Sequence, residues 1–156
     1  MNTILSILTA FTFAFNAFAQ GFSKNGDISD DMIPEEWEYL GSATGDLNND
    51  GRADLFVVAR PPEGGKPVAA VYWDLGDAQW TLYKQYDNAF CDPTKMYYTP
   101  EYDIEIQDNG TLVINLYDPE DFDFSILTSY SFHYKDGDFK PATSDTKNNF
   151  GDFEIN

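Results

Sequence analysis

Residues 45–59, GDLNNDGRADLFVVA, are the stretch of this chain that decides its fold. The first ten of these residues are rich in Asp, Asn and Gly, which favour tight turns. The last five, 55–59, form an uninterrupted apolar run with the length of a β-strand. The stretch therefore predicts a turn that leads directly into a buried strand.

Short strands are also predicted on both sides of this stretch, separated by turn-forming residues. Residues 101–107 alternate polar and apolar side chains, which is the period of a half-buried strand. The sequence Asn109-Gly110 follows, and this pair favours a tight hairpin because both residues tolerate positive φ. The predicted strands are 37–45, 55–59, 67–73, 79–86, 101–107, 111–117, 124–134 and 138–140, and Phe150, Phe153 and Ile155 suggest one more. No stretch has the 3.6-residue apolar period of a helix. The fold class is therefore all-β, mainly antiparallel, as a sandwich or an open barrel.

The length and composition agree with one folded domain. The chain has 156 residues, of which 42% are hydrophobic and 17% aromatic, enough to build a core. Residues 20–36 are polar and acidic, and we expect a flexible lead-in there. Residues 37–156 are then a single β-rich domain.

The amino terminus has the features of an export signal. Residues 1–19 contain no charged side chain and end in Ala17-Phe18-Ala19, the small-x-small pattern that signal peptidase recognises. A membrane anchor is the alternative, but Thr and Asn residues interrupt the apolar run and leave it short for a span. We expect a cleaved signal peptide over 1–19, a mature chain that starts near Gln20 without a membrane anchor, and a periplasmic or secreted location.

The chain is strongly acidic, with 27 Asp and Glu against nine Lys and Arg, a formal net charge of −18. Nucleic acids are not expected as partners, because phosphate binding needs a basic surface. Cations and basic proteins remain as partners, although acidity also serves solubility alone.

The turn at 45–54 carries a pattern of oxygen ligands. Calcium binds six to eight hard oxygen atoms, which a curved loop supplies from alternate residues. We expect ligands from the side chains of Asp46, Asn48, Asp50 and Asp54 and from the main-chain carbonyl of Arg52, with Gly51 allowing the sharp turn. The alternative is an ordinary turn, in which Asp, Asn and Gly serve only the backbone.

The stretch GDLNNDGRADLFVV, residues 45–58, resembles the calcium loops of FG-GAP and VCBS-type repeat proteins, whose pattern is GDxNxDGxxD before an apolar strand. The resemblance implies the same ligand set, at Asp46, Asn48, Asp50, Arg52 and Asp54. It covers about a tenth of the chain. One such motif does not make a propeller, which needs several blades. The chain more loosely resembles small exported proteins of Gram-negative bacteria with one such loop after a Pro-x-x-Trp segment, here 34–37.

Other candidate sites are weaker. The single cysteine, Cys91, is not tied to the single histidine, His133, so a catalytic pair is not expected. An acidic loop at 118–123 lacks the glycine of a calcium turn. Four aromatic residues are candidates for a sugar-binding face, but aromatic residues at strand spacing more often belong to a core: Trp73, Trp80, Tyr97 and Tyr98.

The sequence therefore favours an exported, calcium-binding β-domain that is a binding or interaction module of the cell envelope and not an enzyme. Two alternatives remain open. One is an acidic binder or inhibitor of a basic envelope protein, which the charge would attract. The other is an enzyme that acts on carbohydrate. Calcium is the expected cofactor, and a basic protein or a glycan is a possible partner.

Overall fold

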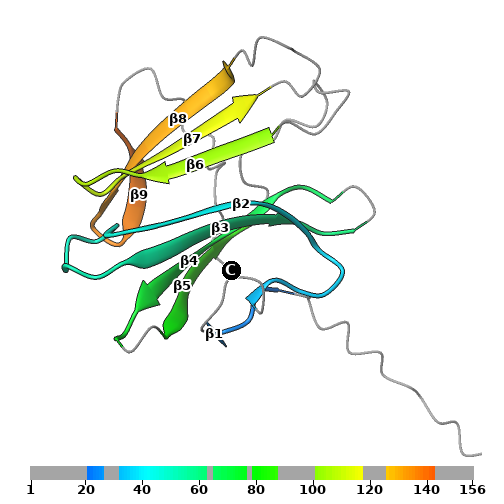
Figure 1. The fold of residues 1–156 in the computed structure, drawn as a ribbon, viewed down its shortest axis with the longest axis horizontal. Helices are drawn as coiled ribbons and strands as arrows, with labels where there is room; N and C mark the ends of the chain where they lie inside the picture. Colours follow the sequence, from blue (N-terminus) through cyan, green and yellow to red (C-terminus); the bar gives the residue numbers. More distant parts are fainter. Residues whose placement is uncertain are drawn as a thin grey trace, which may run out of the picture.

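The chain folds into two antiparallel sheets, which confirms the all-β class (Figure 1). This computed structural model describes residues 21–26, 32–62, 65–76, 79–87, 101–117 and 126–142. The first sheet has the order β1-β5-β4-β3-β2 and the second has the order β6-β7-β8-β9. The strands are β1 (Asn25–Gly26), β2 (Glu38–Gly45), β3 (Asp54–Arg60), β4 (Val68–Asp74), β5 (Trp80–Tyr86), β6 (Glu101–Ile106), β7 (Thr111–Tyr117), β8 (Ile126–Lys135) and β9 (Asp138–Pro141). The two sheets face each other, and one of them curls like half of a barrel. In the described ranges no helix is long and apolar enough to span a membrane.

Strand β3 is buried on both of its faces. Successive side chains of a strand point to opposite faces, so Phe56 and Val58 lie on one side and Leu55 and Val57 on the other. The first pair packs in the core between the two sheets. The second pair packs in a separate core on the outer face of the first sheet. The uninterrupted apolar run in the sequence is the direct consequence of this two-sided burial.

The segment before β2 supplies the cover for the outer face, which differs from the flexible lead-in expected over 20–36. Phe22 and Met32 are buried there, and Trp37 packs against the same core. The Phe22 ring meets the edge of Trp37 at a centroid distance of 5.6 Å. Strand β1 adds backbone pairing with β5 through Asn25 and Gly26. Polar and acidic composition predicted a loose segment, but a few well-placed apolar side chains anchor its described part.

Side-chain contacts hold the two sheets together at each edge. At the β5–β9 edge the Asp138 carboxylate accepts hydrogen bonds from Lys84 Nζ and the Tyr86 hydroxyl, both at 3.0 Å. Burial alone would raise the pKa of Asp138, but these bonds and the amide of Phe139 lower it below its ordinary value. The carboxylate is therefore stabilised in its charged form, and it ties the first sheet to the second.

At the opposite edge, β2 and β6 approach closely because β2 carries glycines. A Cβ atom at Gly45 would lie 2.6 Å from Ile106 Cγ2 and 2.7 Å from Ile106 Cβ. A Cβ atom at Gly41 would lie 3.0 Å from Ile104 Cδ1, the tip of a flexible side chain. The two glycines thus give the isoleucines of β6 room to pack on β2.

Gly45→Ala should lower the free energy of unfolding by about 1–3 kcal/mol, the range for overpacking a close contact. Gly41→Ala is the matched control on the same strand and should cost less, because a Cβ atom there would lie 3.0 Å from the tip of Ile104 and 3.3 Å from Tyr102 Cβ, both longer than the contacts at Gly45. Both substitutions reduce the conformational entropy of the unfolded chain by the same amount. The difference between their unfolding free energies therefore measures the steric clash alone. Urea unfolding of the two variants measures it. Equal losses for both would show that the close packing of Ile106 is not the reason for Gly45.

Candidate metal centre

The predicted ligand loop joins β2 to β3 at one end of the two sheets. The β4–β5 turn and the β6–β7 hairpin lie at the same end (Figure 1). Asn49 has φ 61° and Gly51 has φ 84°, so both residues adopt the left-handed conformation. Asn and Gly are the residues that reach this region most easily, which confirms the role expected for Gly51 in the turn.

Three predicted ligand side chains are brought together around the amides of the loop. Asp46 accepts the amide of Asp50 at 3.0 Å through Oδ1 and the amide of Gly51 at 2.8 Å through Oδ2. The Asn48 side-chain oxygen accepts the same Asp50 amide at 2.9 Å. Asp50 in turn accepts the amide of Arg52 at 2.9 Å. Because Asp46 and Asn48 share one donor, their oxygens lie on the same side of the loop.

Asp54 lies apart from these three, on the buried side of the loop. Its side chain has no exposed surface. One carboxylate oxygen accepts the amide of Leu47 at 3.1 Å, and the other accepts the amide of Asp74 at 3.2 Å. Burial raises the pKa of Asp54 to about 6, with a further rise from the negative charge of Asp50 and a partial offset from the amide hydrogen bonds. Asp54 therefore anchors the loop through two amide hydrogen bonds, while burial destabilises its charged form.

The carboxylates of the loop do not meet at a single point in this arrangement. Across the described residues, no group of three His, Cys, Asp or Glu side chains is close enough to hold a metal ion. The donor chemistry nevertheless suits calcium. A carboxylate oxygen has two lone pairs, so an oxygen that accepts one amide can still face an ion. The ligand role of the Arg52 carbonyl stays a prediction, and the Arg52 guanidinium contacts the Asp74 carbonyl at 3.4 Å.

Asp74 is the residue of this centre that the sequence did not reveal. Its amide holds Asp54, and its carbonyl accepts the Arg52 guanidinium. Its side chain accepts the amide of Gly76 at 2.7 Å and so shapes the β4–β5 turn. The available signal was weak, an Asp followed by Leu-Gly at the end of a predicted strand. Only the pairing of β3 with β4 places Asp74 beside Asp54.

The weaker sequence candidates are not joined to this centre. His133 is exposed and its Nδ1 lies 3.1 Å from the Thr111 hydroxyl. Trp73 packs against Tyr83 with ring centroids 4.6 Å apart, and Trp80 lies at the β4–β5 turn. The remaining candidates fall outside the described residues: Cys91, Tyr97, Tyr98, the acidic loop 118–123 and the last aromatic residues.

In chelator, the protein should become more stable as the pH falls from 7 to 5. The Asp54 pKa is higher in the folded chain than in the unfolded chain, so the folded state binds more protons in this window. Stability is therefore lost again as the pH rises through about 6. The gain on acidification should be about 1 kcal/mol, measured by urea unfolding at each pH. Asp54→Asn should remove this slope and Asp103→Asn, an exposed control on β6, should keep it. A slope that survives in Asp54→Asn would assign it to another group.

Comparisons with known proteins add nothing to the description of this centre. No protein-family model, no curated protein and no solved structure matches this chain. The likeness of residues 45–58 to an FG-GAP loop stays a resemblance of sequence.

Proposed function

We propose that this chain is an exported, calcium-stabilised β-domain that works as a non-catalytic binding module in the periplasm or outside the cell. The observation that carries the proposal is the position of Asp54. Its carboxylate is fully buried, its described hydrogen bonds come from neutral amides, and Asp50 acts on it with a charge of the same sign. A buried charge without a counter-charge is destabilising. A divalent cation in the loop would supply that counter-charge.

The composition of the loop supports calcium over other ions. Asp46, Asn48, Asp50 and Asp54 offer only hard oxygen atoms, which suit calcium and magnesium and not zinc or copper. Magnesium demands a near-ideal octahedron and tends to keep its waters. Calcium accepts the irregular geometry of a loop whose oxygens also serve amides.

A stabilising ion agrees with the place of the loop in the fold. Leu47, inside the loop, is buried in the core between the sheets. A Cβ atom at Gly110 would lie 3.0 Å from the Asp46 carbonyl, so the β6–β7 hairpin of the second sheet rests on the loop. An ion that fixes the loop would therefore also fix the contact between the two sheets at this end.

The charge of the chain favours a second candidate, an acidic binder or inhibitor of a basic envelope protein. A formal charge of −18 would speed the encounter with a basic surface. A pull-down from envelope extract tests this candidate. Capture of a basic protein that disappears at high salt, but is equal in calcium and in chelator, would favour it.

Calcium should bind with a stoichiometry of one and raise the melting temperature. At about 100 times the dissociation constant the stabilisation should be roughly 2.7 kcal/mol, because the ion binds the folded loop only. Asp50→Ala should remove most of this gain and Asn48→Ala should remove less, because the first deletes a charged ligand. Asp103→Ala deletes the same charge from an exposed position on β6 and should leave the gain intact. The affinity should fall at low pH, because protons compete for the carboxylates.

Calorimetric titration and melting curves in calcium and in chelator decide this proposal. The absence of binding heat, together with identical melting curves, would show that the loop is an ordinary turn.

A further inference from the structure

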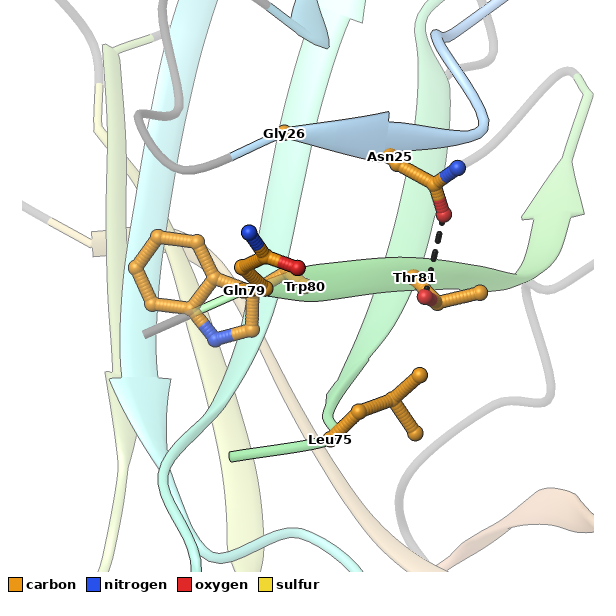
Figure 2. Close-up of a pocket in the computed structure, with 6 residues that line it drawn as sticks. All are labelled: Asn25, Gly26, Leu75, Gln79, Trp80 and Thr81. Carbon is orange, nitrogen blue, oxygen red and sulfur yellow. Dashed lines mark hydrogen bonds between the residues drawn. The ribbon is translucent and has the colours of Figure 1, made fainter. Parts of the chain in front are cut away.

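A surface pocket of about 450 Å³ lies where β1 and the β4–β5 turn meet. Figure 2 shows six residues of the described ranges that line it, with the Thr81 hydroxyl donating to the Asn25 side-chain oxygen at 3.0 Å. The other four lining residues are Gly26, Leu75, Gln79 and Trp80. The volume falls within the range of about 300–1,000 Å³ that is typical of small-molecule sites.

The lining combines an aromatic ring with neutral polar groups. Asn25 and Gln79 carry amides, Thr81 carries a hydroxyl, and each of these groups can both donate and accept hydrogen bonds. The Trp80 indole and the exposed Leu75 supply apolar surface. A saccharide presents the matching chemistry, since its ring has an apolar C–H face and a rim of hydroxyl groups. None of these six described lining residues is ionisable, so a charged ligand would find no counter-charge among them.

The pocket is joined directly to the predicted calcium loop. The Trp80 Nε1–H donates to the carbonyl of Ala53 at 3.0 Å. Because β4 lies between β3 and β5 in the sheet, the indole reaches across the end of β4 to make this bond. Asp74, which holds Asp54, precedes Leu75, and the Leu75 amide bonds to the Gln79 carbonyl at 3.1 Å. The orientation of the ring and the shape of the turn therefore depend on the backbone at 52–54.

We propose that this pocket binds a neutral saccharide, with Trp80 as the stacking surface and Gln79 and Asn25 as hydroxyl partners, and that calcium in the loop strengthens this binding by fixing Ala53. The second half of the proposal rests on the proposed calcium function. The coupling is physical, because an ion that orders residues 46–54 also orders the carbonyl that orients the Trp80 ring.

The test is calorimetric titration of the folded protein with maltotriose, cellotriose and tri-N-acetylchitotriose, each in calcium and in chelator. Trigalacturonate is the charged control and should not bind. At least one neutral trisaccharide should bind, with an affinity about tenfold lower in chelator. Titration with calcium alone, on the same sample, measures the loop independently.

Three variants assign the effect to the pocket. Gln79→Ala changes an exposed side chain and should weaken binding without a change in melting temperature. Trp80→Phe keeps an aromatic surface but loses the bond to Ala53, so it should still bind and should lose most of its dependence on calcium. Trp73→Phe removes an indole outside the pocket and should behave as the parent protein does.

The outcomes separate the two proposals. If none of the neutral saccharides binds in either condition, the pocket proposal is overturned, while a heat of calcium binding would still support the proposed function. If a saccharide binds equally in calcium and in chelator, or if Trp80→Phe keeps the full calcium dependence, the link through Ala53 is overturned.

Discussion

The burial of β3 on both faces is the constraint on which the rest of this structure depends. An apolar strand without a polar face needs cover on each side, since each buried large apolar side chain contributes about 1.5–3 kcal/mol. The second sheet covers Phe56 and Val58, and the segment before β2 covers Leu55 and Val57. The strand begins at Asp54, so its first carboxylate is carried into the interior with it. The costly charge at the loop is thus a consequence of the same burial that holds the sheets together.

Local patterns in the sequence were enough to predict strands β2 to β9 and the turns between them, but not β1. The run 55–59, the alternation at 101–107 and the pair Asn109-Gly110 each act within a few residues, and the structure has strands and a hairpin there. Contacts between residues far apart in the sequence could not be predicted from these local patterns. The meeting of β2 with β6 needs glycines opposite isoleucines from another part of the chain. The packing of Phe22 and Met32 was missed because two isolated apolar side chains in a polar segment show neither the helical nor the strand periodicity of apolar residues.

The candidate centre was predicted as a list of residues but not as a geometry. In the structure Asp46 and Asn48 accept the same amide and Asp50 accepts the amide of Arg52, while their role as metal ligands stays a prediction. The spacing did not reveal that Asp54 would be shared between Leu47 and Asp74, since strand pairing alone brings Asp74 there. Backbone amides and a cation compete for the same oxygens in such a loop. The amides already maintain the shape of this turn, so the proposed ion would add charge balance to it.

The short β1 strand has a consequence for self-association. It pairs with β5 at only two residues, Asn25 and Gly26, and the amide of Leu82 adds one more bond to the Lys24 carbonyl. Without these bonds part of β5 would present unpaired main-chain groups at a sheet edge, which is a template for another chain. The same segment carries Phe22 over the outer core. Proteolytic cleavage just after residue 26 would therefore expose an unpaired edge of β5 and part of the apolar outer core together, and both would favour intermolecular β-sheet association.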